Sequence, residues 1–332
     1  MNLRTWASAL PALALLGLSA HAPSALAEEF PSRPIRIVVP YPAGGGTDAM
    51  ARLAAERLQM SLKQTVLVDN KPGAGSVIGS DFVAKSRGDG YTLLLNIPAL
   101  VQAPLLQANV PFDAVRDFVP VTTFVSAPVW FAVNTSRVKA TDFAAFKDEA
   151  RKAQTAQGGR GLEYGSWGPG TTNHLYGELL LKAMDLQAVH VPYKGSAPGT
   201  MALANGEITF MMADYITLRP HAEAGRIRIL ASTGARRHRL TPDVPTLAEL
   251  GYPGFESVGW AGFFAPKGTP ADTVTKLEQA IVAVTREPLV IEKMANLGFE
   301  PGGKPQAEFA REVQGDAERW RRTIQAVGFK PE

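Results

Sequence analysis

Two glycine-rich turns are the residues of this chain best suited to hold an anion. The first covers residues 42–48 (Pro-Ala-Gly-Gly-Gly-Thr-Asp) and follows the apolar run 35–39. The second covers residues 164–172 and comes directly before the helical stretch 173–184. Free backbone N–H groups at a helix start, together with the positive end of the helix dipole, bind negative groups. Since the turns are about 120 residues apart, we expect them in different lobes, holding one small carboxylate between them.

In the first turn, glycines allow the backbone to approach a ligand closely and to point N–H groups at it. Thr47 adds a hydroxyl, and the alternative interpretation is an ordinary tight turn between a strand and a helix. Asp48 would repel an anion, so we expect its side chain to turn away and bond to backbone or to a neighbouring loop. The candidate ligand contacts are Ala43, Gly44, Gly45, Gly46, Thr47 and Asp48.

In the second turn, Ser166, Thr171 and Thr172 offer hydroxyl donors beside helix-start amides, and Gly170 adds a backbone donor. Trp167 either forms an apolar wall for the ligand or packs at the surface of its lobe. His174 falls in the first helical turn, where the dipole disfavours a cation, so we interpret it as a structural histidine.

Two further groups follow expected strands. Lys194 either pairs with a carboxylate or stays solvated, while the amides of Gly195 and Ser196 are further candidate donors. Asp214 either accepts from a ligand amine or hydroxyl or serves only the turn at its strand end. Tyr215 follows it and is a further candidate ligand contact.

Catalytic and metal chemistry have little support. An exported hydrolase is the enzyme alternative, but Ser166 lacks the G-x-S-x-G context because residue 164 is Tyr. The chain has no cysteine, which removes thiolate catalysis and cysteine metal sites. The histidines after residue 27 have no H-x-x-x-H spacing: His174, His190, His221 and His238. We therefore expect no enzyme activity, no metal and no cofactor.

The first 27 residues are typical of a signal peptide. Arg4 supplies the positive charge, residues 6–18 form a short apolar region, and Ala25-Leu26-Ala27 gives the cleavage site. The rest is long enough for two lobes. The only dense basic cluster, residues 236–239, has no interleaved aromatic residue, which argues against nucleic-acid binding. We expect a periplasmic protein of a Gram-negative cell.

Short apolar runs alternate with amphipathic segments, which indicates an α/β fold with mostly parallel strands. The expected strands cover residues 35–39, 66–68, 92–95, 129–133, 162–166, 189–193, 208–212, 227–231 and 259–265. The expected helices cover residues 47–60, 76–84, 142–156, 172–184, 197–204, 218–224, 247–250, 271–285, 288–297 and 305–327.

Across essentially all of the chain after residue 27, the sequence resembles the tripartite tricarboxylate transporter substrate-binding receptors, also called Bug proteins. Trp167 and Tyr215 stand where such receptors usually have a small and a polar residue, and this departure from the family indicates a less polar ligand. The matching motifs cover residues 40–48, 68–76, 88–93, 164–166, 174–175, 177–179, 190–195 and 243–246, with Glu249.

The resemblance implies a type II periplasmic binding protein fold, with two α/β lobes joined by two crossing strands and a ligand cleft between them. Residues 28–126 and 250–332 then form lobe 1, and residues 127–249 form lobe 2. The crossings are expected near residues 121–129 and 255–262. The implied function is to capture a small carboxylate and deliver it, as a monomer, to the large and small membrane subunits of a transporter. A sensor that signals through a membrane partner would use the same closure of the lobes.

Overall fold

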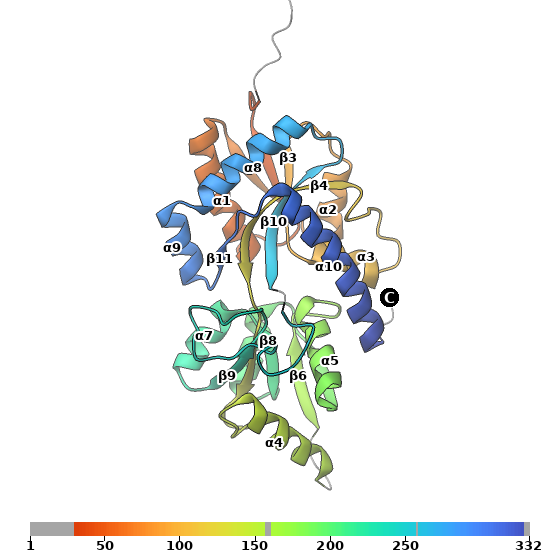
Figure 1. Cartoon of the computed structure of the whole chain (residues 1–332), viewed down its shortest axis with the longest axis vertical. Helices are drawn as coiled ribbons and strands as arrows, with labels where there is room; N and C mark the ends of the chain where they lie inside the picture. Colours follow the sequence, from red (N-terminus) through yellow and green to blue (C-terminus); the bar gives the residue numbers. More distant parts are fainter. Residues whose placement is uncertain (1–29, 157–160, 257, 329–332) are drawn as a thin grey trace, which may run out of the picture.

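The computed structural model describes residues 30–156, 161–256 and 258–328. Within them the chain forms two α/β lobes, one above the other in Figure 1, each built on its own sheet. The expected signal peptide, residues 1–27, lies outside the described residues. No helix in the described part of the chain has the length and apolar character needed to cross a bilayer.

The first lobe contains a six-stranded sheet in the order β11-β4-β10-β3-β1-β2. Its strands are β1 (Ile35–Val39), β2 (Val66–Asn70), β3 (Thr92–Asn96), β4 (Phe118–Ala127), β10 (Gly259–Pro266) and β11 (Glu300–Pro301). The second lobe contains a five-stranded sheet in the order β7-β6-β8-β5-β9. Its strands are β5 (Trp130–Asn134), β6 (Leu162–Ser166), β7 (Ala188–Pro192), β8 (Phe210–Ala213) and β9 (Ile227–Ser232).

Both sheets are mixed, so the expectation of mostly parallel strands is wrong. In the first lobe β1 pairs in parallel with β2 and β3, but β10 is antiparallel to β3 and β4. In the second lobe β6 pairs in parallel with β7 and β8, but β5 is antiparallel to β8 and β9. The antiparallel strands include β4, β5 and β10, which lie where the chain passes between the lobes. Because the chain crosses the boundary there, these strands run opposite to the parallel strands of the sheet.

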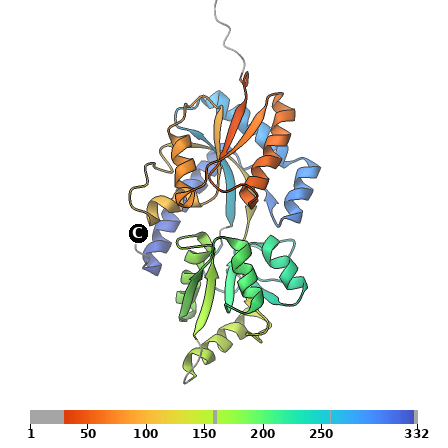
Figure 2. The ribbon, with the colours of Figure 1, turned by 180° about the vertical axis from the view of Figure 1, so that it is seen from behind.

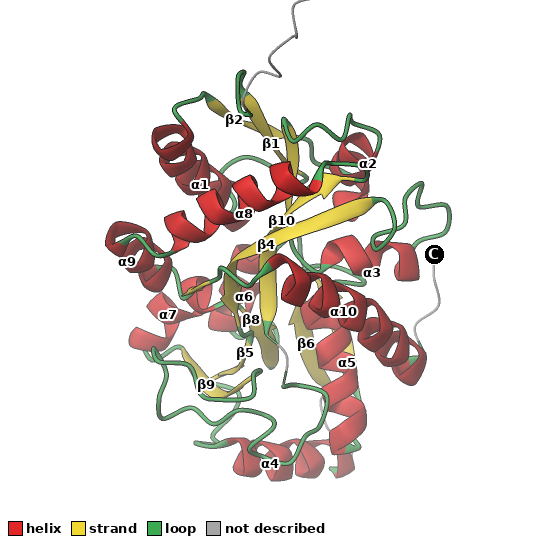
Figure 3. Cartoon of the chain, turned by 45° about the horizontal axis from the view of Figure 1, so that its top comes forward, coloured by secondary structure: helices red, strands yellow, loops and turns green. Residues whose placement is uncertain are grey.

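Ten α-helices in the described residues cover the two sheets (Figure 3). They are α1 (Gly46–Leu62), α2 (Val77–Ala84), α3 (Ala99–Leu106), α4 (Phe143–Thr155), α5 (Thr172–Met184), α6 (Ser196–Asn205), α7 (Tyr215–Glu223), α8 (Ala271–Thr285), α9 (Pro288–Asn296) and α10 (Gln306–Val327). Residues 247–250, expected as a short helix, instead form a turn after Thr246, which bridges Ser232 at the end of β9.

The two-residue period of the strands assigns side chains to the two faces of each sheet. In β1, Ile35 and Ile37 pack with α1 and α8, whereas Val38 faces the opposite side with α3 and α10. In β5, Phe131 packs with α4 and α5, whereas Trp130 packs with α6 and α7. Helices therefore cover both faces of both sheets, which leaves the strand ends to carry the functional loops.

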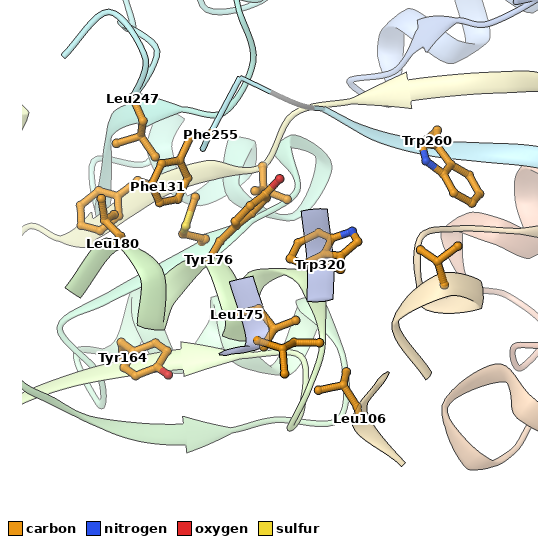
Figure 4. Packing of buried hydrophobic residues seen from close by; sticks show 14 of the residues in the cluster. Leu106, Phe131, Tyr164, Leu175, Tyr176, Leu180, Leu247, Phe255, Trp260 and Trp320 are labelled. Carbon is orange, nitrogen blue, oxygen red and sulfur yellow. The ribbon is translucent and has the colours of Figure 1, made fainter. Parts of the chain in front are cut away.

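The last helix, α10, extends from the first lobe onto the second. Trp320 of α10 packs against Tyr176 of α5 with ring centroids 5.1 Å apart. Near the end of the helix, Lys182 Nζ donates to the carbonyl of Ala326 at 2.6 Å. Figure 4 shows Trp320 beside Tyr176 within one buried cluster whose members come from both lobes. The two lobes thus share one continuous core on this side of the molecule.

A buried polar contact fixes α10 to the strand β10. The carboxylate of Asp316 on α10 accepts from Trp260 Nε1 at 2.8 Å and pairs with Arg319 at 2.8 Å. Asp316 is 2% exposed. Burial raises its pKa, although Arg319 and the indole N–H act in the opposite direction.

The carboxyl ends of β1 and β6 both point toward the boundary between the lobes. In Figure 2 the chain enters β1 at the top of the upper lobe and runs down toward the lower lobe. In Figure 1, β6 runs upward from the bottom of the lower lobe toward the upper one. The turns after these strands, residues 40–45 and 167–171, are therefore at the boundary, and each leads directly into a helix.

Candidate functional site

The first glycine turn is held in place by Asp48, four residues after Gly44. Gly44 has φ +85°, a value that favours glycine, and its N–H donates to Asp48 Oδ2 at 2.9 Å. Asp48 Oδ2 also accepts from Arg52 Nε at 2.9 Å, and Oδ1 accepts from Asn70 Nδ2 at 3.0 Å. The expectation that Asp48 bonds to backbone is confirmed, while its other partners belong to α1 and to the end of β2 rather than to a neighbouring loop.

The environment of Asp48 keeps it ionised. The residue is 3% exposed, and burial alone would raise its pKa. Hydrogen bonds from Arg52, Gly44 and Asn70, with the charge of Arg52, instead hold the pKa below its usual value. The carboxylate thus stays charged beside the start of α1 and keeps the turn fixed.

The amides at the start of α1 are the donors that this turn presents. The helix begins at Gly46 after Gly45, which has φ −81° and ψ 171°. Within the described chain no side chain caps this start, and residues 43–46 are exposed. Because the first N–H groups of a helix have no partner within it, those of Gly46 and Thr47 are available to an anion.

The second turn is tied together by buried side chains. Ser166 is fully buried, and its Oγ lies 3.1 Å from both N and O of Gly168 and 2.6 Å from His190 Nε2. Asn173, also fully buried, accepts from Trp167 N at 3.3 Å and from Thr171 Oγ1 at 2.8 Å. These bonds make Ser166 part of the framework of the turn.

Gly170, expected as a ligand contact, donates its N–H to His174 Nδ1 at 2.9 Å. Its φ is +71°, and an added Cβ would lie 2.9 Å from Leu106 Cδ1 of the first lobe. Thr171 precedes α5 with no side-chain cap in the described residues, so the first amides of α5, beginning at Thr172, lack helical partners. The second turn therefore also presents its donors from the helix start.

Behind the second turn, the buried imidazole of His174 stacks on the half-buried imidazole of His190. The rings of His174 and His190 are 3.9 Å apart at an interplanar angle of 8°. Tyr164 stacks on His190 at 5.0 Å, and its hydroxyl donates to Glu178. Burial, as the larger cause, and the neighbouring imidazole, as the smaller one, lower the pKa of His174 to about 4. Burial also lowers the pKa of His190, although the charge of Glu178 opposes this. At neutral pH both rings are therefore neutral.

The second turn also contacts the first lobe. Gln102 of α3 is 2% exposed, and its Nε2 donates to Thr172 Oγ1 at 2.9 Å across the boundary. Trp167 is half-buried and packs against the core shared by the two lobes and against the second-lobe core around Trp130. Sequence reasoning missed Gln102 because no local pattern links α3 to residue 172.

The remaining candidate residues begin two other helices of the second lobe. Gly195 has φ +107° and precedes α6, Ser196 Oγ lies 2.8 Å from Thr217 Oγ1, and Lys194 is exposed. Asp214 caps α7 by accepting from Thr217 N at 3.1 Å. Tyr215 lies 5.3 Å from the ring of Trp130 and beside Gly298 of the first lobe.

Two hollows in the described residues lie away from this arrangement. Hollows of about 370 and 660 Å³ lie along α5 and β7, and neither is lined by a residue of the two turns. Within the described ranges no group of three or more His, Cys, Asp or Glu side chains is placed to hold a metal ion. Two lobes with uncapped helix starts at their shared boundary are the arrangement of a two-lobed binding protein.

The chain belongs to the tripartite tricarboxylate transporter receptor family, whose profile matches residues 50–329. Among its relatives, the protein BugT of Bordetella pertussis is 34% identical over 310 residues, covering 92% of this chain and 92% of BugT. The family is one of periplasmic solute-binding receptors.

Two similar solved structures hold small dicarboxylates. Rpa4515 of R. palustris with adipate has a TM-score of 0.80 and 34% identity, covering 91% of this chain and 100% of that chain. MatC (Rpa3494) from Rhodopseudomonas palustris with bound malate has a TM-score of 0.75 and 27% identity, covering 89% of this chain and 100% of that chain.

Proposed function

We propose that this protein is a periplasmic receptor that binds a small carboxylate between its lobes and delivers it to membrane subunits of a tripartite transporter. The observation that carries the proposal is the pair of uncapped helix starts, at Gly46 and Thr172, directed at one boundary. The adipate and malate held by the two similar structures support a dicarboxylate as the ligand class.

The available donors are sufficient for a receptor of ordinary affinity. Micromolar binding corresponds to about −8 kcal/mol. A hydrogen bond to a charged group contributes about 1.5–3 kcal/mol. Four or five such bonds from the starts of α1 and α5 would reach this value after the costs of ordering and of lost translational freedom.

Catalysis is not part of the proposal. Ser166 lies 2.6 Å from His190, as a nucleophile lies beside its base, but Ser166 is fully buried and also contacts both backbone atoms of Gly168. A nucleophile must reach its substrate, whereas this hydroxyl holds the turn together. Delivery to a transporter and signalling through a membrane partner both use ligand-driven closure, and the family of the chain favours delivery.

The test is a thermal-shift screen of residues 28–332 against mono-, di- and tricarboxylates, including adipate, malate and aromatic acids. Ligand that binds the folded state alone raises the melting temperature. We expect at least one carboxylate to do so and to be recovered unchanged after long incubation. If no carboxylate shifts the melting temperature, the receptor proposal is wrong, and chemical conversion of a hit would support an enzyme instead.

A further inference from the structure

The two glycine turns are stabilised by the same local device. In each turn a glycine with positive φ donates its N–H to a side chain four residues later, in the first turn of the following helix. Gly44 donates to Asp48 Oδ2, and Gly170 donates to His174 Nδ1, both at 2.9 Å. Both acceptors are nearly inaccessible, Asp48 at 3% and His174 at 5% exposure.

We propose that Asp48 and His174 are positioning residues that fix the two turns, so that the helix-start amides of α1 and α5 face the ligand. Neither side chain contacts the ligand in this scheme. Each takes one glycine N–H out of the set of possible donors and thereby sets the direction of the amides that follow. We call each of these glycine-to-side-chain hydrogen bonds, Gly44 to Asp48 and Gly170 to His174, a clasp. The inference rests on the proposed receptor function for its ligand, but the two clasps are properties of the free protein.

The chemistry of the His174 imidazole suits its position as an acceptor in the second turn. A buried cation at the start of α5 would oppose the helix dipole, whereas a neutral imidazole with an unprotonated Nδ1 is a good acceptor there. The titratable groups around His174 include His190 from β7, Tyr164 from β6 and Glu178 on its own helix. Glu178 lies 3.9 Å from His174 Nε2, on the opposite side of the ring from the accepting nitrogen.

Acid should open the clasp in the second turn. Protonation of His174 places a hydrogen on Nδ1, so the ring can no longer accept from Gly170. Since burial and the adjacent His190 lower the pKa of His174 to about 4, the clasp is intact at neutral pH and is lost as the pH falls through about 4.

The decisive experiment measures the Gly170 amide in ligand-free protein by NMR. We expect a scalar coupling between Gly170 N and His174 Nδ1, and an Nε2-protonated tautomer for His174. His174→Leu should lower the exchange protection of the Gly170 amide by about tenfold. His174→Asn, whose Oδ1 can occupy the place of Nδ1, should retain the protection and lose its fall near pH 4. His221→Asn, on α7, is the control and should change neither quantity.

Ligand binding provides the second measurement, with adipate as the first probe and then the other members of the carboxylate panel. We expect His174→Leu to weaken binding about tenfold or more and His174→Asn to restore it. Equal Gly170 protection in the wild-type and Leu proteins would overturn the clasp, and unchanged affinity despite lost protection would overturn the positioning role. If no carboxylate binds the wild-type protein, the receptor function fails, while the exchange data still decide whether His174 holds the turn.

Discussion

The backbone N–H of Gly46 gives the sharpest test of how the protein holds an anion, because one substitution removes it without disturbing the fold. Gly46 is the first residue of α1, where proline is well tolerated. Gly45 already has the extended conformation that a following proline requires, and a Cβ at position 46 meets no atom within 4 Å. Gly46→Pro therefore deletes one donor, whereas Gly46→Ala adds a side chain and keeps the N–H.

The expected loss of affinity follows from the kind of bond removed. A hydrogen bond to a carboxylate contributes about 1.5–3 kcal/mol, which corresponds to an increase in Kd of about 10- to 150-fold. The proline should not destabilise the free protein, because it restricts the unfolded chain and is worth up to about 1 kcal/mol in favour of folding. The two effects have opposite signs, so poor folding cannot imitate the loss of binding.

The assay is isothermal titration calorimetry with the carboxylate that gives the largest thermal shift, together with urea unfolding of the ligand-free proteins. Gly46→Ala should bind within about threefold of the wild type, since the donor remains. If Gly46→Pro binds as tightly as Gly46→Ala, the start of α1 does not supply a donor and the reasoning about the first turn is refuted.

Three further predictions concern the framework around the site. Trp260→Phe should lower the free energy of unfolding by about 1.5–3 kcal/mol more than Trp320→Phe, measured by urea unfolding followed by circular dichroism. Both indoles are buried, but Trp260 also donates to the carboxylate of Asp316. Equal losses in the two variants would contradict this. Burial raises the pKa of Asp316, so the contribution of this group to the free energy of unfolding should fall as the pH rises above 3.8. The unfolding free energy of the wild type minus that of Asp316→Asn should therefore decrease with pH; a difference that does not change with pH would argue against it. A double-mutant cycle of Gln102→Leu and Thr172→Val should give a coupling of about 0.5–1.5 kcal/mol in unfolding free energy across the lobe boundary, and a coupling near zero would mean that the bond adds no stability.

Most of the regular elements could be predicted because their apolar periodicity and turn residues agree. The strands at 35–39 and 162–166 and the helices at 172–184 and 271–285 have the predicted bounds. The apolar pattern does not assign α3, β4 or the two-residue β11, and only the family resemblance places a crossing near residues 121–129, which overlaps β4. Local signals in α3 and β4 conflict. Pro104 lies within α3, and β4 is buried along both faces, so neither shows a clear period.

The turns themselves could be predicted from their glycines, but the use of each N–H could not. The inward turn of Asp48 followed from charge alone, since a carboxylate is repelled by an anion. The role of His174 required the packing of α5 against β6 and β7, which buries the ring and stacks it on His190. The contact from Gln102 depends on how the two lobes pack against each other, which a local sequence pattern does not predict.

The path of α10 has a consequence for how the chain reaches its native state. Trp320, near the carboxyl end, completes the wall around Tyr176, although about 140 residues separate them along the chain. Contacts of such long range are formed late and slow the search for the native state. The side of the second lobe around Tyr176 is therefore covered only after the final helix has been synthesised and has packed onto it.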